Sequence, residues 1–144
     1  TGHHFNQVTL ANGRVLMTGG LSASVNLATL ALTTTPLGTA CVYDQPTNTW
    51  TSLTMPVARS LHSATRLPDG RVVLCGGAQG TIDLPVPIAD VTLFDPATNG
   101  FSVSTPLPAP RAAHAGMLLP DGTVVLLGGQ DPVATTATIE LLRF

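Results

Sequence analysis

Two short stretches of the chain consist entirely of apolar residues. Residues 72–75 read VVLC and residues 124–127 read VVLL. A β-strand with one face in water alternates apolar and polar residues, whereas a strand that is buried on both faces does not. Both stretches are therefore predicted to be strands of sheets that are covered on their two sides.

Turn signals divide the surrounding sequence into segments of strand length. Pro68-Asp69-Gly70 is typical of a hairpin turn, because proline presets φ and glycine tolerates a positive φ where the chain reverses. Residues 96–99, which read Pro-Ala-Thr-Asn, form a second turn of this kind. Residues 61–105 are therefore predicted to form a unit of four strands. They are residues 61–67, 71–75, 90–95 and 100–105.

One phrase occurs three times along the chain. It reads GRVLMTGG from Gly13, GRVVLCGG from Gly70 and GTVVLLGG from Gly122, so the copies begin 57 and 52 residues apart. The match extends beyond the glycines, since ARSLHSATRLPDG at 58–70 is echoed by PRAAHAGMLLPDG at 110–122. A repeat with this period indicates one supersecondary unit per copy, and a period near 50 is typical of kelch propellers.

These residues resemble the kelch repeat, with its double glycine, its Tyr-Asp strand end and an aromatic residue a few positions later, as in VYDQPTNTW at 42–50. The resemblance covers nearly the whole chain. It implies an all-β fold, a β-propeller segment of four-stranded antiparallel blades. We predict one such segment over 1–144, with blade 1 at 1–58, blade 2 at 59–110 and a partial blade 3 at 111–144. The third copy includes a third strand at 138–143, and blade 3 is predicted to lack its outer strand.

Two complete blades and a partial one do not close a ring, and the outer faces of the first and last blades would be left in water. We therefore expect the propeller to be completed by the remainder of a longer chain or by a second copy. A six-bladed dimer is attractive because repeats are stabilised mainly by their neighbours. The charged residues make up only 10% of the chain, which also indicates that large faces are buried.

Charge and hydropathy exclude two classes of partner. The chain has no lysine, its arginines are scattered and its formal net charge is −2, so no basic stripe exists for nucleic acid. No apolar run approaches the roughly 20 residues that span a bilayer. High alanine, threonine and proline without lysine indicate a bacterial source with a GC-rich genome. The resemblance favours a secreted or extracytoplasmic location.

Three long and unequal segments are predicted to lie together on one face of the propeller, opposite the tight turns. They are residues 21–40, 78–88 and 130–137. Unequal loops on a regular scaffold are where binding normally resides, and Asp83 and Asp131 are candidate ligand-binding residues there.

The segment 21–40 is the longest of the three and carries no charge. Its part 21–32 is the most helix-like stretch of the chain, but it is rich in Ser, Val and Thr, so we predict a loop. Such a loop could pack against a neighbouring blade, chain or domain, contact a ligand, or be disordered. Its apolar residues are Val25, Leu27, Leu30 and Leu32.

A second group of candidate ligand-binding residues precedes or begins the innermost strands. Arg59 and Arg111 are each followed three residues later by a histidine, His62 and His114, while Phe5 takes the histidine position in the first copy. Matching positions of adjacent blades would bring these groups to the channel mouth, where bidentate arginine bonds could hold a carboxylate or a vicinal diol. The alternative is a structural role, in which they bond loop carbonyls between blades.

The sequence predicts no metal site, no cofactor and no catalytic residue. The histidines are spaced by whole blades, which is not a ligand spacing, and no carboxylate cluster accompanies them. Cys41 and Cys75 fall on different blades and are expected to be small buried hydrophobes. A disulfide between them would need Cα atoms within roughly 7 Å of each other.

We therefore expect a non-catalytic binding or assembly module, with protein or carbohydrate ligands on the long-loop face. The phrase LPDGRVVLCGG also resembles repeats of proteins similar to galactose oxidase, whose copper site uses tyrosines, histidines and a tyrosine-linked cysteine. A fragment of such an enzyme is one alternative, although the only tyrosine, Tyr43, matches Phe94 in the next repeat and so indicates packing. Sialic-acid mutarotases also resemble kelch propellers. A fragment of a mutarotase, with Arg59 or Arg111 acting on a carboxylated sugar, is another alternative.

Overall fold

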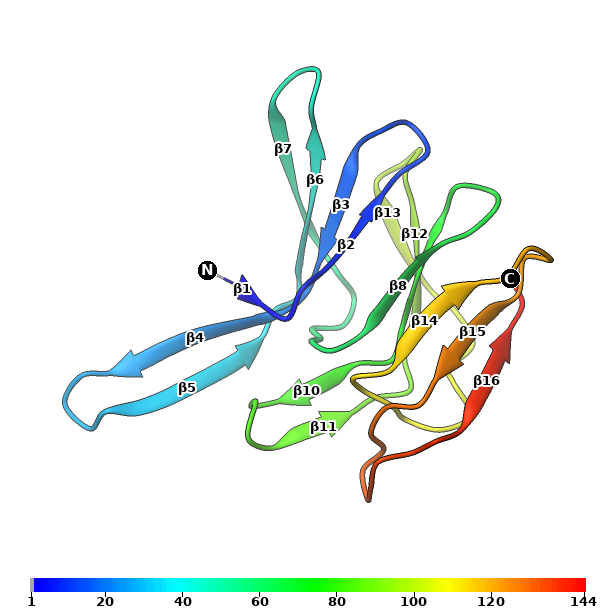
Figure 1. Ribbon diagram of the computed structural model, residues 1–144. Helices are drawn as coiled ribbons and strands as arrows, with labels where there is room; N and C mark the ends of the chain where they lie inside the picture. The colour runs from blue at the N-terminus through cyan, green and yellow to red at the C-terminus, as the bar shows by residue number, and fades with distance from the viewer. Residues whose placement is uncertain (1) are drawn as a thin grey trace.

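The computed structural model describes residues 2–144, so residue 1 of the predicted blade 1 lies outside the described part. All regular secondary structure in this range is β-strand, and the strands form five sheets. Three sheets stand side by side as blades, and two smaller sheets project from one end of them (Figure 1). No helix that could cross a bilayer occurs between residues 2 and 144. The predicted all-β architecture is confirmed.

Each blade is an antiparallel sheet whose strands follow one another along the chain, and the repeat predicted these strands correctly. Blade 1 consists of β2 (Asn6–Thr9), β3 (Val15–Thr18), β6 (Thr39–Asp44) and β7 (Thr49–Thr54). Blade 2 consists of β8 (Ser63–Arg66), β9 (Val72–Cys75), β12 (Val91–Asp95) and β13 (Gly100–Val103). Blade 3 has three strands in the described range, β14 (Ala115–Leu118), β15 (Val124–Leu127) and β16 (Ile139–Leu142).

The prediction of a loop at 21–40 was wrong. This segment contains a hairpin of β4 (Leu21–Asn26) and β5 (Ala31–Pro36), and β1 (Gly2–His3) pairs with β4. Thr and Val favour strands, and the Asn26 side chain supplies the turn by accepting bonds from the backbone N–H groups of residues 28 and 29. The hairpin projects away from blades 2 and 3 (Figure 1).

The segment 78–88 also forms a hairpin, which lies beside the first one. It consists of β10 (Ala78–Gly80) and β11 (Pro85–Pro87). The Ile82 N–H donates a hydrogen bond of 2.8 Å to the Thr34 hydroxyl of β5, which ties the two hairpins together. We call these two hairpins the hairpin face. The tight turns of the blades lie at the opposite end of the sheets (Figure 1).

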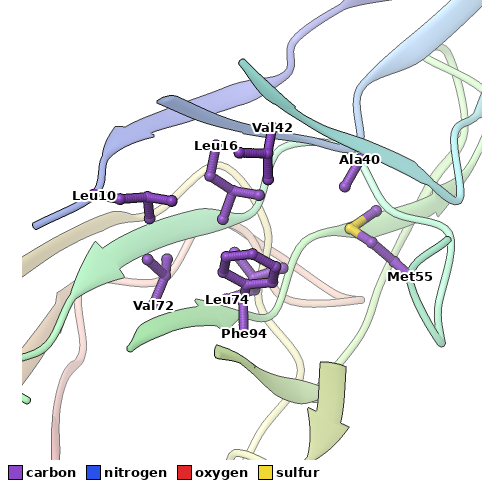
Figure 2. Packing of buried hydrophobic residues seen from close by; sticks show 8 residues of the cluster. All are labelled: Leu10, Leu16, Ala40, Val42, Met55, Val72, Leu74 and Phe94. Atoms are coloured by element: carbon purple, nitrogen blue, oxygen red, sulfur yellow. The ribbon is translucent and has the colours of Figure 1, made fainter. Parts of the chain in front are cut away.

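Two apolar clusters fill the spaces between blades, and β9 contributes to both. The cluster between blades 1 and 2 consists of Leu10, Leu16, Ala40, Val42, Met55, Val72, Leu74 and Phe94 (Figure 2). The cluster between blades 2 and 3 consists of Leu67, Val73, Cys75, Val91, Leu107, Val124 and Leu126. Val72 and Leu74 thus face blade 1, whereas Val73 and Cys75 face blade 3. The prediction that this strand is covered on both sides is confirmed.

The outer face of blade 3 is apolar along all three strands. Val124 and Leu126 face blade 2, and alternate residues of a strand point to opposite sides, so the neighbouring positions face away from it. These residues, which we call the outer face of blade 3, are Ala115, Met117, Val125, Leu127, Ile139 and Leu141. Ile139 and Leu141 are 64% and 66% exposed. The second cover predicted for the VVLL strand is not supplied by residues 2–144.

Candidate functional site

The same backbone feature follows each of the two predicted arginines. Leu61, two residues after Arg59, has φ of 54°, and Ala113, two residues after Arg111, has φ of 53°. A left-handed conformation costs a residue with a Cβ roughly 1–2 kcal/mol, so the surrounding structure must hold it. The histidine of each repeat comes directly after this residue, at the start of the innermost strand.

Arg59 is fully buried and spans the second and third strands of blade 2. One terminal nitrogen donates to the carbonyl oxygens of Gly76 at 3.1 Å and Asp90 at 3.3 Å. The other donates to the Asp90 carboxylate and, at 2.9 Å, to the Thr92 hydroxyl. The guanidinium charge is therefore compensated inside the blade, as a buried charge must be.

Arg111 repeats this arrangement in blade 3 with one exchange. It donates to the Gly128 carbonyl at 3.0 Å and the Thr138 carbonyl at 3.3 Å. Its other nitrogen donates to the Thr138 hydroxyl and to the Glu140 carboxylate, both at 2.9 Å. In blade 2 the carboxylate comes first along the third strand and the hydroxyl second, whereas in blade 3 the order is reversed. Both orders give the arginine one carboxylate and one hydroxyl.

The backbone of each arginine joins its blade to the preceding one. The Gly20 N–H donates to the Arg59 carbonyl, and the Gly77 N–H donates to the Arg111 carbonyl, each at 2.9 Å. The blades approach so closely here that a Cβ at Gly76 would overlap the Arg111 carbonyl oxygen, and a Cβ at Gly19 would overlap the Arg59 carbonyl oxygen. The double glycine of the repeat is thus the contact point between blades.

The two histidines face polar side chains of the preceding blade. His62 Nε2 lies 2.8 Å from the Thr18 hydroxyl, and the Asn6 amide donates to the His62 carbonyl. His114 Nε2 lies 2.9 Å from the Ser63 hydroxyl. Burial, helped by the charge of Arg59, lowers the pKa of His62 to about 3, and burial with the charge of Arg111 lowers the pKa of His114 to about 4. Both imidazoles are neutral at pH 7, and their Nδ1 atoms are buried without a partner among the described residues.

Blade 1 has an open depression where blades 2 and 3 hold their arginine. Gly2 occupies the arginine position, and the equivalents of Gly76, Asp90 and Thr92 in blade 1 are Gly19, Thr39 and Cys41. The depression measures about 420 Å³ and has no charged residue in its lining. It is lined by Phe5, Met17, Thr18, Gly19, Leu37, Thr39, Ala40, Cys41 and Ser52.

The comparison with solved structures decides the fold. The chain is similar to a fungal alcohol oxidase of the AA5 family with catalytic diversity, solved in complex with copper, with a TM-score of 0.68 and 22% sequence identity. The alignment covers 91% of this chain and 28% of that one, so the chain spans less than a third of the oxidase. The fold is a segment of a kelch-type β-propeller. No protein-family model matches the sequence, and no curated protein matches it significantly.

The six candidate ligand-binding residues of the kelch segment fall into two groups. Arg59, His62, Arg111 and His114 are buried. The arginine side chains bond carbonyl groups of their own blades, and the histidine rings face hydroxyl groups of the preceding blade. The other two, Asp83 and Asp131, lie on loops at the end that carries the hairpins. Asp131 accepts bonds from the Val133 and Ala134 N–H groups, which lower its pKa. Ligand binding by any of the six stays a prediction.

The described part of the kelch segment, residues 2–144, does not offer a cluster of side chains that fits a copper ion. Between residues 2 and 144 no three side chains of His, Cys, Asp or Glu come close enough together to hold a metal. Cys41 and Cys75 are both free thiols, and burial raises the pKa of Cys75 to about 12.

Sequence reasoning missed the carboxylate partners of the arginines. Asp90 begins the predicted strand 90–95 and Glu140 lies within the predicted strand 138–143, but neither is predicted to bind an arginine. A signal for them exists in the sequence, because both repeats that carry the arginine also carry an acidic residue and a threonine two positions apart at the start of the third strand. Blade 1, which lacks the arginine, has no acidic residue there.

Proposed function

We propose that this chain is a non-catalytic assembly and binding module. It supplies consecutive blades of a kelch propeller, receives a further blade on the outer face of blade 3, and binds a protein or carbohydrate ligand on its hairpin face. The further blade would come from additional chain or from a second copy. The observation that carries this proposal is the exposed apolar surface on blade 3.

The equivalent surface of blade 2 explains why an exposed face of this kind indicates an assembly contact. Ile139 of blade 3 stands at the position of Val91 in blade 2, and Leu127 at the position of Cys75. Val91 and Cys75 are each 1% exposed because blade 3 covers them. Burying apolar surface contributes about 25 cal/mol per Å², so a further blade would gain the same kind of stabilisation here.

The chemistry of the hairpin face favours a protein ligand over a sugar. Leu27 and Leu30 at the tip of the β4–β5 hairpin are 86% and 80% exposed, and Leu84 in the β10–β11 turn is also exposed. Neither hairpin contains an aromatic residue, and Asp83 is the single charged residue of the pair. Exposed aliphatic side chains on rigid hairpins fit an apolar protein surface, and the sugar alternative would depend on Asp83 and the hydroxyl groups of β4 and β5.

Two measurements on the purified chain test the assembly part of the proposal. The wild-type chain should self-associate or bind the hydrophobic dye ANS, and Ile139→Asp with Leu141→Asp should remove both properties. The matched control, Leu27→Asp with Leu30→Asp, alters the hairpin tip and should leave them unchanged. A wild-type chain that is monodisperse, monomeric and unable to bind the dye would overturn the proposal.

Similarity to the fungal alcohol oxidase favours a second candidate, in which the chain is part of a copper-dependent oxidase propeller. Because residues 2–144 of this chain contain no cluster that fits copper, the metal site of such an enzyme would be built from other residues. The test is elemental analysis and an alcohol-oxidation assay on the whole product of the gene. Stoichiometric copper with turnover would support this candidate, and a metal-free, inactive product would exclude it.

A further inference from the structure

The depression in blade 1 lies at the position that a guanidinium group fills in blades 2 and 3. Arg59 of blade 2 donates to Gly76, Asp90 and Thr92. The equivalents of these three residues all line the depression, and they are Gly19, Thr39 and Cys41. The sequence places Gly2 at the arginine position of this blade. The groups that bind a guanidinium in blade 2 therefore border an open space of about 420 Å³ in blade 1.

Two of the acceptors at this position are backbone carbonyl groups, and blade 1 retains both of them. In blades 2 and 3 these carbonyls accept bonds of 3.0 to 3.3 Å from the arginine. The Gly19 N–H donates to the Thr39 carbonyl at 3.0 Å, as the Gly76 N–H donates to the Asp90 carbonyl at 2.8 Å. The backbone that presents the two oxygen atoms is therefore shared by the blades and does not require the arginine.

The side chains at this position are neutral in blade 1. Thr39 stands in place of Asp90, and its hydroxyl group can still accept a hydrogen bond. Cys41 stands in place of Thr92, but Ser52, which pairs with Cys41 across the sheet, adds a hydroxyl group to the lining. Two carbonyl oxygens and two hydroxyl groups around one space suit a planar group with several N–H donors, which is what a guanidinium is.

Phe5 gives the depression an aromatic wall. Its side chain is 44% exposed and lines the space, whereas the equivalent residues His62 and His114 are buried imidazoles. A cation over the face of an aromatic ring is attracted by the quadrupole of the ring, and a guanidinium also stacks on such a ring. The Phe5 ring therefore favours a cation at a position where blade 1 has no carboxylate.

The third strand of each blade leaves an opening to solvent at this position. The Asp90 side chain is 19% exposed beside the fully buried Arg59, although blade 1 adjoins it. Thr39, which stands where Asp90 stands, is exposed. Because the groups that line the opening belong to blade 1 itself, access at Thr39 does not depend on what adjoins this blade.

We infer that the depression in blade 1 is a binding site for a guanidinium group of another molecule, such as the arginine side chain of a protein ligand. The group donates to the Gly19 and Thr39 carbonyls and to the Thr39 hydroxyl, and its plane lies against Phe5. It keeps contact with water on its open side, so it does not need the buried counter-charge that Arg59 requires. This inference goes beyond the proposed function, because the described lining shares no residue with the hairpin face or with the outer face of blade 3.

Titration with a capped arginine, followed by calorimetry and by the shifts of backbone amide resonances, tests the inference on the purified chain. N-acetyl-arginine-N-methylamide should bind saturably and shift the amides around the depression. The capped lysine should bind about fivefold more weakly or worse, because an ammonium group lacks the planar fork of donors. Methylguanidinium distinguishes the source of the group. Equal affinity would indicate a small guanidine as the ligand, and weaker binding would indicate an arginine side chain of a polypeptide.

Three variants test the position of the site. Gly2→Arg supplies the guanidinium from the chain itself and should abolish binding of the capped arginine. Thr39→Asp with Cys41→Thr copies Asp90 and Thr92, and it should tighten binding about tenfold by adding a charge-assisted hydrogen bond. Leu27→Arg adds the same charge at the tip of the β4–β5 hairpin. It is the matched control for Gly2→Arg and should leave the affinity unchanged.

Several results would overturn the inference. They are a wild-type chain that does not bind the capped arginine, equal affinity for the capped lysine, and binding that survives Gly2→Arg. The melting temperature of each variant shows whether it folds. Phe5→Ala, a change at a half-exposed side chain, is a second variant that should weaken binding about threefold or more, and an unchanged affinity would also contradict the site. None of these results bears on the proposed function, which self-association and ANS binding test at the outer face of blade 3.

Discussion

Blade 2 and blade 3 share one strand plan but differ in their surroundings. Both have a buried second strand, an arginine that bonds the second and third strands, and a histidine that faces the preceding blade. Blade 2 is covered on both faces, whereas the described chain covers only one face of blade 3. Each blade is therefore stabilised by two separable contributions. The first is the set of bonds that its own arginine makes within the blade, and the second is the apolar packing against its neighbouring blades.

The largest effect is expected from removing the internal contribution. Arg59→Met should lower the free energy of unfolding by about 3–5 kcal/mol, because the Asp90 carboxylate and two carbonyl groups lose their buried donor. Arg111→Met should cost the same to within about 1 kcal/mol, because its partners also lie in its own blade. Urea denaturation measures both values. A much smaller cost in blade 3 would show that the arginine depends on neighbouring blades.

Alanine substitutions at the equivalent glycines should cost different amounts of stability in blade 2 and blade 3. Gly76→Ala places a methyl group against the Arg111 carbonyl and should cost about 3 kcal/mol or more through overpacking and a left-handed φ of 55°. Gly128→Ala, at φ of 62°, meets no atom closer than 3.5 Å and should cost about 1–2 kcal/mol in the monomer. Equal losses in denaturation of the dilute monomers would contradict the difference in coverage.

The histidines add a pH dependence at each junction. The folded pKa of His62 is about 3, below its ordinary value of 6.5, so the unfolded chain takes up the proton first as pH falls. Stability contributed by the neutral imidazole is present above pH 6.5 and is lost as pH falls below it. Between pH 7 and pH 5 the loss should be roughly 2 kcal/mol for His62. Comparing wild type with His62→Gln at both pH values measures it, and parallel pH profiles would refute the assignment.

The smallest effect concerns the apolar side chains themselves. Val73→Ala, in the middle of the cluster between blades 2 and 3, should cost about 2 kcal/mol. Val125→Ala, at the same position of blade 3, should cost about 1 kcal/mol less in the monomer, because Val125 is 7% exposed and lies outside the clusters between blades. Urea denaturation of both variants beside wild type measures the difference, and a cost for Val125→Ala as large as that for Val73→Ala would argue against it.

The features that the sequence predicts well are those with short-range causes. The Pro-Asp-Gly turns, the strands they join and the two-sided burial of residues 72–75 depend on local sequence and on the repeat. The repeat also predicts which positions are equivalent, and this is why the strands of all three blades agree with expectation.

The remaining features depend on register between strands that are distant in sequence. The β4–β5 hairpin was missed because its Ser, Val and Thr residues were interpreted as a loop, although the cross-strand pairing of Val25 with Leu32 and Ser24 with Thr33 suits a strand. The bonds of Arg59 to Asp90 and Thr92 join residues about thirty positions apart, and only the sheet brings them together. Phe5 lines the depression in blade 1 together with Met17 and Cys41, and only the sheet brings these three residues together.

The arginine and the histidine of the Arg-x-x-His motif constrain the evolution of such a chain in different ways. The guanidinium takes its counter-charge from its own blade, whichever of the two third-strand positions carries it. A duplicated or transplanted blade would therefore contain the counter-charge of its own buried arginine. The imidazole takes its partner from the blade before it, so reordering the blades would leave mismatched junctions. A few residues at each junction between blades thus restrict the order in which the blades can follow one another.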